Sequence, residues 1–502
     1  MPRWGRPSAL CLPTLFVRSY RLSSFHPKNP QPVFKNSLRK TLEAQRIANR
    51  VRLIRKVYPV TAESSEIKAP QLTPTTATDG VRSLRRSSQK NGIRSVRRER
   101  RGTRALKRPQ SPVQSLSWKV DESAERPAQY PWLEFLQPNT CELDGLSRLD
   151  AEIRSLEAYL SPNNQEQDAI DQIVRDLSTL VAGTVPHAPQ VVGSRHTGMA
   201  LVHSNLDLII PVDDPELPDD RDRKPSPMRP RAVRAYQDTL RAAEPALRQS
   251  SLFENVHLSQ DRVPAITMVH LPTGIPLRIY CGQELPDSLE YVKNYQTEFP
   301  ALRPLYMTLR MILDVRSNFG ANRSSIGPYG LLMLIVAVLK LHRHPPNSLG
   351  EQLLDILHMY STEVNLETTG VSVDPPGFFD FATIRRDESL AEERGEEEPP
   401  YLRGQRALLR FKVRARDKGN HPAARHLCIQ DPANYLNDVG WPCVRTAELQ
   451  GAMADAYQRL RAALNAWEGD DDGGPDSVLG QALQANFDDL KQLRSRISRV
   501  AG

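Results

Sequence analysis

Two short segments carry residues whose types and spacing suit chemistry on phosphates. The triplet Gln190-Val191-Val192 runs into Gly193-Ser194, and about ten residues later Asn205 and Asp207 open a second apolar stretch. A glycine and a serine at the end of a strand let backbone amides and a hydroxyl approach a phosphate closely. Phosphoryl transfer by two metal ions needs paired carboxylates nearby, with a third from a neighbouring strand. Taken alone, the pattern also fits a plain buried strand.

The elements that must position these residues can be predicted from hydrophobic patterning. The stretch 206–212 has apolar residues at alternate positions, which predicts a strand. Because successive side chains of a strand point to opposite faces, Asn205 and Asp207 would lie on the same face. Strands over 265–271 and 275–281, joined by Pro272-Thr273-Gly274, predict a hairpin. Helices are expected over about 145–182 and 231–248, with a proline-rich and aspartate-rich loop at 213–230 between. These elements predict a mixed α/β unit over 145–290, with ordered structure from about Tyr130.

Beyond Pro300 the pattern becomes mostly helical. The expected helices cover 305–315, 329–341, 349–360 and 446–467, and the acidic stretch 387–400 is expected to be a solvated loop. An acidic hinge at 468–476 precedes a last amphipathic helix at 478–500. The longest apolar run, Leu331 to Leu339, is far shorter than the roughly 20 residues that span a bilayer, so we expect a buried helix and no integral membrane segment.

Several of these segments occur together at a spacing that resembles one known family. The matching motifs are Gly193-Ser194, Ser204 to Leu208, Val263 to Ile279, Leu302 to Leu305 with the Tyr329 helix, Leu349 to Asp355 with Thr369 to Ser372, and Asp431-Pro432 with Asn437 to Gly440. Over 130–465 they resemble the noncanonical poly(A) polymerase and terminal uridylyltransferase branch of the DNA polymerase β-like nucleotidyltransferases. The resemblance implies an α+β fold: a nucleotidyltransferase palm with a mixed sheet, plus a mostly helical domain associated with poly(A) polymerases.

The resemblance also implies which residues would bind metal, and there the chain departs from the family. The first palm aspartate of the family falls on Asn205, the second on Asp207 and the third on Arg278. One of three metal carboxylates therefore remains, and it is the only metal ligand that we expect. The family uses two Mg²⁺ or Mn²⁺ ions to add AMP or UMP to an RNA 3′ end.

Positions that contact the nucleotide in the family are altered in part. Its paired lysines fall on Arg310, which suits a phosphate, and on Asp314, which would repel one. Tyr329 is retained and is expected either to stack on a base or to be a buried tyrosine with a satisfied hydroxyl. Asn437 and Asp438 are expected either to contact a base edge or to cap a turn.

Charge is distributed unevenly along the chain. The 502 residues carry a net charge of +8, but the first 110 residues carry +21 and the remaining 392 carry −13. Residues 1–42 hold eight Lys/Arg and no acid, a composition typical of a mitochondrial transit peptide; the alternative is a basic N-terminus that is never cleaved. The run 82–108 holds twelve basic residues and one acid. It is expected to be a disordered arm that contacts RNA phosphates, a solvated linker or part of a presequence.

Other candidate sites in the sequence are weak. His342 and His344 flank Arg343 without a cysteine or acidic residue at ligand spacing, so we expect them to be ordinary loop histidines. The five cysteines have no short paired spacing, which excludes a zinc ribbon or a dense disulfide framework; they are Cys11, Cys141, Cys281, Cys428 and Cys443.

Together these features predict a protein of the mitochondrial matrix with five segments. These are a transit peptide at 1–42, a basic arm at 43–129, a palm at 130–294, a helical domain at 295–467, and a hinge with a C-terminal helix at 468–502. The leading hypothesis is a catalytically impaired family member, without a metal cofactor, that binds or scaffolds RNA. The alternatives are an active 3′-terminal transferase with an altered Mg²⁺ or Mn²⁺ site, and a structural subunit of a mitochondrial ribonucleoprotein.

Overall fold

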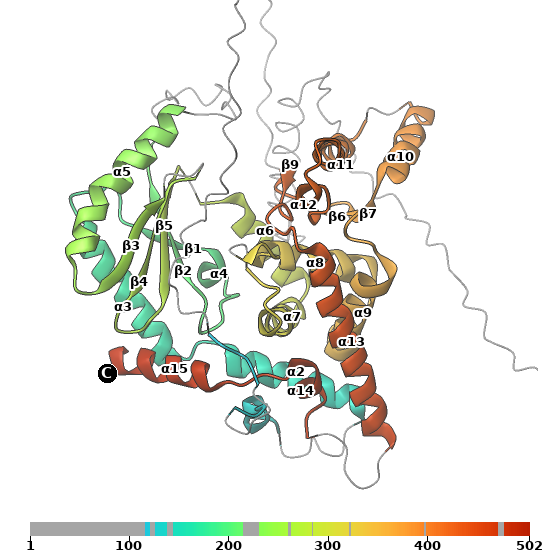
Figure 1. The fold of residues 1–502 in the computed structure, drawn as a ribbon, viewed down its shortest axis with the longest axis horizontal. Helices are drawn as coiled ribbons and strands as arrows, with labels where there is room; N and C mark the ends of the chain where they lie inside the picture. The colour runs from blue at the N-terminus through green and yellow to red at the C-terminus, as the bar shows by residue number, and fades with distance from the viewer. Residues whose placement is uncertain are drawn as a thin grey trace, which may run out of the picture.

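A computed structural model describes residues 116–120, 126–137, 144–213, 230–259, 263–283, 285–320, 323–395, 398–469 and 476–501. The expected transit peptide at 1–42 and the basic run at 82–108 lie outside these described residues. Within them, no helix is long and apolar enough to cross a membrane. Two sheets lie apart from each other, each with its own helices (Figure 1).

The larger sheet forms the palm. Its strands are β1 (Gln190–Val192), β2 (Leu206–Pro211), β3 (Phe253–Ser259), β4 (Ala265–His270) and β5 (Pro276–Gly282). Their order across the sheet is β1-β2-β5-β4-β3, and β2 and β5 are parallel while the other neighbours are antiparallel. The predicted β4–β5 hairpin is confirmed. Strand β3 was not predicted, because at the sheet edge most of its side chains are exposed or half-buried and leave no apolar pattern.

The helical pattern expected over 145–182 is confirmed, but it is divided between two helices. The structure has α2 (Gly145–Leu160) and α3 (Asn164–Val181), separated at Pro162. Proline cannot donate the backbone hydrogen bond that continues a helix. Asn163 then caps α3, accepting a hydrogen bond from the Glu166 amide while the Glu166 carboxylate accepts one from the Asn163 amide. The two helices also have different partners, because α2 packs on the helical part of the molecule.

The helical part surrounds one helix that is apolar on every side. That helix, α8 (Pro328–Leu341), is buried from Gly330 to Leu339, as its long apolar run predicts. It packs against α7 (Leu302–Val315) and α9 (Leu349–His358). The helical part also contains α6 (Asp287–Glu298), which packs on α7, and the turn η4 (Met359–Glu363) and α13 (Thr446–Gly469), which pack on α9. The helix α5 (Pro230–Gln249) packs on the palm sheet instead.

A second, smaller sheet was not predicted within the helical part. Its strands are β6 (Gly370–Val373), β7 (Pro376–Phe379), β8 (Cys428–Asp431) and β9 (Asn434–Asp438), in the order β7-β6-β8-β9. The stretch expected to be a loop at 387–400 is partly helical. Helix α10 (Phe381–Glu393) starts at a capping box formed by Asp380 and Thr383, and α11 (Pro400–Asp417) and α12 (His421–Ala424) follow.

Segments from both ends of the described chain meet under the two parts. The last helix, expected as one, is split into α14 (Val478–Leu483) and α15 (Asp488–Ala501). Between them the buried Phe487 packs edge-to-face against Trp118, Trp132 and Tyr159. Trp118 is only 4% exposed, so the folded core starts before the expected Tyr130. The short helix η1 (Pro131–Phe135) completes this corner.

Candidate functional site

The turn after β1 lies directly against Asp207. Gly193 has φ +69°, a conformation that glycine adopts without strain, and it starts the short helix α4 (Gly193–His196) with Ser194 next in line. A Cβ atom on Gly193 would lie 3.1 Å from Asp207 Oδ2. The antiparallel register pairs Val192 with Asp207. The structure therefore brings the predicted Gly-Ser turn and the retained carboxylate together.

The two other palm positions also lie beside Asp207. Arg278 is its register partner across the parallel β2–β5 pair, so both side chains project from the same face of the sheet. Asn205 lies two residues before Asp207 and is exposed, although the strand itself begins only at Leu206. The Arg278 guanidinium lies 5.8 Å from the Tyr280 ring centroid on the same strand. The structure therefore brings Arg278 beside Asp207, as the sequence predicted, with Asn205 just before the strand.

The electrostatic surroundings of Asp207 are cationic. Burial raises the pKa of Asp207, while the charges of Arg278 and Arg195 oppose that rise. Burial lowers the pKa of Arg195 to about 10, which leaves it protonated at neutral pH. The Arg195 Nη2 donates to the Ser204 carbonyl at 2.6 Å, which holds the guanidinium in place.

This set of side chains does not fit a site for two divalent ions. Such a site needs several hard, anionic oxygen ligands, and the three positions provide one carboxylate, one amide and one guanidinium. Two unit charges about 4 Å apart interact by roughly 4 kcal/mol at an effective dielectric constant of about 20. Replacing a carboxylate by a guanidinium exchanges that attraction for a similar repulsion. The palm therefore disfavours the metal ions on which nucleotidyl transfer depends.

The predicted phosphate ligand Arg310 is buried. It is 7% exposed, its Nη1 donates to Ser204 Oγ at 2.8 Å, and its guanidinium lies 4.9 Å from the Phe319 ring centroid. In this arrangement Arg310 ties α7 to the segment that precedes β2.

Asp314, one turn further along α7, has a structural role that sequence analysis missed. Its carboxylate accepts hydrogen bonds from the indole of Trp118 at 3.3 Å and from Arg323 at 2.8 Å, and it lies 3.7 Å from His203. Burial opposes ionisation, but His203, Arg310 and Arg323 together hold the pKa of Asp314 below its usual value. An aspartate here binds the N-terminal segment rather than a triphosphate. The sequence could not indicate this role, because Trp118 lies 196 residues before Asp314 in the chain.

Tyr329, Asp431 and Asn437 meet where α8 faces the small sheet. The Tyr329 hydroxyl donates to Asp431 Oδ1 at 3.1 Å, and the Asn437 amide donates to Asp431 Oδ2 at 2.9 Å. Burial, then the charge of Asp431, raises the pKa of Tyr329 well above its usual value. The hydroxyl of Tyr329 is thus satisfied, while Asn437 is exposed and offers an amide oxygen to solvent.

Asp438 is fully engaged in its own turn. Its Oδ1 accepts from the amides of Ile429 and Gly440 at 2.9 Å each, and its Oδ2 lies 2.8 Å from His426 Nε2. This is the turn-capping alternative that the sequence left open. Of the two neighbouring residues, Asn437 is the exposed one, and Asp438 is used within the turn.

An exposed basic and aromatic surface adjoins Asn437, and sequence analysis did not identify it. Residues 400–425 carry eight Lys/Arg and one acid. Arg410, Arg414 and Lys418 recur every four residues along α11 and its end, so they line one face. Phe411 is 49% exposed and Trp441 43% exposed, with ring centroids 4.6 Å apart. We call these five residues the α11 surface.

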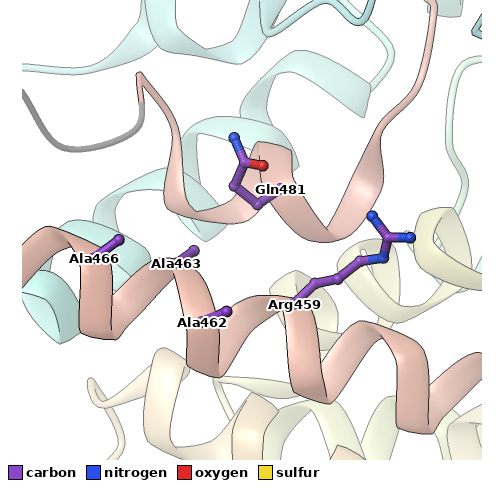
Figure 2. Close-up of a pocket in the computed structure, with 5 residues that line it drawn as sticks. All are labelled: Arg459, Ala462, Ala463, Ala466 and Gln481. Atoms are coloured by element: carbon purple, nitrogen blue, oxygen red, sulfur yellow. The ribbon is translucent and has the colours of Figure 1, made fainter.

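A hollow of about 320 Å³ lies elsewhere, between α13 and α14 (Figure 2). It is lined by Arg459, Ala462, Ala463 and Ala466 from α13 and by Gln481 from α14. None of the residues predicted from the sequence lines it. Its small, mostly apolar lining offers no group that could activate a nucleophile.

Comparisons with known proteins agree with the palm and its motifs. Residues 149–285 match the model of the family described as "Poly(A) RNA polymerase, mitochondrial-like, central palm domain". The chain is 23% identical over 410 residues to Poly(A) RNA polymerase CID14 of Cryptococcus neoformans, which covers 76% of this chain and 46% of that protein. It is 23% identical over 287 residues to Poly(A) RNA polymerase gld-4 of Caenorhabditis elegans, and this match covers 55% of this chain and 28% of that protein. The chain thus spans less than half the length of these curated relatives.

A solved structure shows the same fold over most of the chain. The polymerase core of TRAMP, an RNA surveillance complex, superposes with a TM-score of 0.55 and 18% identity, covering 71% of this chain and 99% of that one. This confirms the predicted α+β nucleotidyltransferase fold. The palm match, the curated relatives and the arrangement of Gly193, Asp207 and the β4–β5 hairpin all support the same family. The palm at 149–285 is similar to that of the noncanonical poly(A) polymerases and terminal uridylyltransferases.

Proposed function

We propose that this family member binds RNA but has lost most or all nucleotidyl transfer, and that it acts as a binding or scaffolding subunit in mitochondrial RNA metabolism. One observation carries the proposal: Asp207 is paired in register with Arg278, and Asn205 lies beside them. Two of the three positions that hold metal in the family therefore lack a carboxylate here. The half-buried Arg195 adds a second cation that acts on Asp207.

The α11 surface supports the RNA-binding part of the proposal. Proteins bind single-stranded nucleic acid by pairing cations with phosphates and by stacking exposed aromatic rings on bases. Arg410, Arg414 and Lys418 are exposed and form no ion pair with any described residue, so they are available to phosphates. Trp441 and Phe411 supply the rings, and Trp441 lies four residues after Asn437.

Two variants and a matched control test this surface in the full-length chain. Trp441→Ala should weaken binding of a labelled single-stranded RNA by about 5- to 150-fold, the range expected for one lost stacking contact. Arg414→Gln should weaken RNA binding. It should also reduce the slope of log binding constant against log salt concentration by about 0.7, the value expected for the loss of one phosphate contact. The control is Arg406→Gln on the same helix, because Arg406 is already paired with Glu388 and Glu398. Equal affinities for all three variants and the wild type would exclude this surface.

The alternative function is an active 3′-terminal adenylyl- or uridylyltransferase with an altered metal site. The close approach of Gly193 to Asp207 favours it, because that part of the palm is intact. The double variant Asn205→Asp/Arg278→Asp separates the two functions. If transfer has been lost through these replacements, the double variant gains RNA extension from a background of none. High extension by the wild type, unchanged in the double variant, would support the active enzyme.

The mitochondrial location rests on the composition of residues 1–42. They carry eight basic residues and no acid, as import signals do. A fluorescent reporter fused after residue 42 should enter mitochondria, and the same fusion with Arg18, Arg21, Arg39 and Lys40 changed to Gln should stay outside. A reporter that remains cytosolic would contradict the location. A structural role in a ribonucleoprotein would instead show as nucleotide-independent co-sedimentation with a mitochondrial particle.

A further inference from the structure

Two histidines and an aspartate converge at the junction of α8 and α9, away from the residues discussed above. His342 Nδ1 lies 2.7 Å and His344 Nε2 lies 3.0 Å from the same oxygen, Asp355 Oδ2. All three ligand atoms are within 4.8 Å of one another, and among the described residues this is the one group of histidine, cysteine and acidic side chains with such spacing. The expectation that these histidines lack an acidic partner is therefore wrong, because α9 folds back to supply one.

We propose that His342, His344 and Asp355 bind a divalent transition-metal ion, with Zn²⁺ as the best fit. Two imidazoles and one carboxylate are a common set of three zinc ligands, and water completes the fourth position. Metal–ligand bonds of about 2.0–2.2 Å place tetrahedral ligand atoms about 3.3 Å apart. The two separations from Asp355 Oδ2, 2.7 and 3.0 Å, are shorter by about 0.3–0.6 Å, and the two imidazole nitrogens lie within 4.8 Å of each other. Small side-chain rotations would therefore admit the ion.

The backbone around the site is fixed independently of any metal. His342 ends α8, and its amide donates to the Val338 carbonyl at 2.8 Å. The loop that follows is tied to α9 because the buried Gln352 donates its side-chain amide to the Pro345 carbonyl at 2.8 Å. Asp355 lies one turn beyond Gln352 on the same helix. The ligands are thus carried by the cap of α8, the tied loop after it and α9, which lowers the entropy cost of binding an ion.

The surroundings suit an ion that arrives from solvent. His342 is the most exposed of the three, and His344 and Asp355 are partly exposed, so the site has a direct path to water. Glu351 Oε2 lies 3.8 Å from His344 Nδ1, on the side of the ring away from Asp355. Once His344 binds metal through Nε2, a carboxylate at Nδ1 orients the ring and increases its basicity. Glu351 is therefore a positioning residue.

The ligand types distinguish this site from the metal chemistry of the palm. Mg²⁺ prefers carboxylate, carbonyl and water oxygens, whereas imidazole suits Zn²⁺, Co²⁺ and Ni²⁺. An ion bound here would join α8 to α9 and stabilise the helical part without taking part in nucleotidyl transfer. Metal binding at this site does not depend on whether the palm is active.

The test is metal binding by the full-length protein after treatment with EDTA and dialysis. Zn²⁺ is titrated calorimetrically, and Co²⁺ is titrated by its visible absorption, which intensifies in a four-coordinate site. We expect one ion per chain, a thermal unfolding midpoint raised by Zn²⁺, and a loss of at least about 100-fold in affinity for His344→Gln and for Asp355→Asn. Glu351→Gln should lose about 10-fold. Circular dichroism checks that each variant is folded.

His358→Gln is the matched control. His358 lies on the same helix, 3.2 Å from the Glu363 carboxylate, but forms a pair without a second imidazole. It should keep wild-type affinity and stoichiometry. Equal Zn²⁺ affinities of the wild type, His344→Gln and Asp355→Asn would overturn the proposal. A correctly folded wild type that binds no Zn²⁺ would also overturn it. Either result would mean that the two imidazoles only hydrogen-bond to Asp355.

Discussion

Asp207 falls on a position that the family resemblance assigns to a metal ligand, but its neighbours are cationic. Arg278 is its register partner on β5, Arg195 lies on the adjoining helix α4, and the charges of both arginines act on the carboxylate. Asp314 accepts hydrogen bonds from Trp118 and Arg323. At both positions the ionisable side chain interacts with neighbouring groups of the protein.

A buried histidine in the palm predicts a pH-dependent stability. His270 ends β4, is 2% exposed, and its Nδ1 lies 2.9 Å from the Thr273 hydroxyl. Burial lowers its pKa to about 4, with a small opposing effect from Asp176. The unfolded chain takes up this proton near the ordinary value of about 6.5. The contribution of neutral His270 is therefore fully present above pH 6.5 and is lost as the pH falls towards 4.

Urea unfolding at pH 7 and pH 5 measures this effect. The wild type should lose about 2 kcal/mol from this group between the two values. His270→Gln removes the titration and should show a pH dependence smaller by that amount, whatever its stability at pH 7. His257→Gln on the exposed part of β3 is the control and should behave as the wild type. An unchanged pH dependence in His270→Gln would show that His270 is not held neutral.

Sequence analysis located the palm residues because they lie within one local pattern. Gly193, Asn205 and Asp207 are separated by a few residues, and the β4–β5 hairpin brings Arg278 to them in a predictable register. The partners of Asp314 and of His342 could not be predicted in this way. Trp118 lies 196 residues from Asp314 in the chain, and Asp355 approaches the histidines only because α9 turns back.

At the scale of elements, the ends of the described chain support both the palm and the helices. Helix α15 packs on α3 of the palm, where Arg494 pairs with Glu166. Helix α14 packs on α2, where the buried Glu152 accepts hydrogen bonds from the amides of Val478 and Leu479. The C-terminal segment is therefore an integral part of the fold.

The N-terminal segment at 116–120 should contribute strongly to stability. Trp118 is 4% exposed, packs against His203 and Phe487, and donates its indole N–H to Asp314. Trp118→Ala should lower the free energy of unfolding by about 3–5 kcal/mol, as for other buried aromatics. Trp118→Phe keeps most of the packing but loses the hydrogen bond, so it should cost less.

Trp441→Ala is the control for Trp118, because the Trp441 side chain is 43% exposed. It should change the free energy of unfolding by no more than about 1 kcal/mol, while weakening RNA binding. Urea unfolding followed by circular dichroism compares the variants. Similar small losses for Trp118→Ala and Trp441→Ala would mean that residues 116–120 do not form part of the core.

The elements that were missed share a physical cause. Strand β8 is buried along its whole length and lies between two neighbours, so it shows no alternation of polar and apolar residues. Strand β3 has the opposite difficulty, because its side chains are mostly exposed or half-buried. Helix α11 carries so many arginines that its apolar face, with Leu402, Leu408 and Leu409, is difficult to recognise. Long apolar helices such as α8 were predicted well.

For the whole molecule, one hydrophobic core joins the palm and the helices. It contains Leu208 and Ile279 of the palm sheet, Leu334 of α8, and Leu449 and Met453 of α13, all of them fully buried. A shared core keeps the palm and the helical part in a fixed relation, so loss of catalysis does not require loss of the fold. This is the arrangement that the proposed RNA-binding role requires.

The most direct test of this account is extension of a labelled RNA oligonucleotide by the purified full-length chain. Each NTP is supplied in turn, in Mg²⁺ and in Mn²⁺, and binding of the same RNA is measured in parallel. The account predicts no extension with RNA binding intact, and Asp207→Asn should behave as the wild type in both assays. Extension by the wild type that disappears in Asp207→Asn would contradict it, because one carboxylate would then support catalysis beside Arg278.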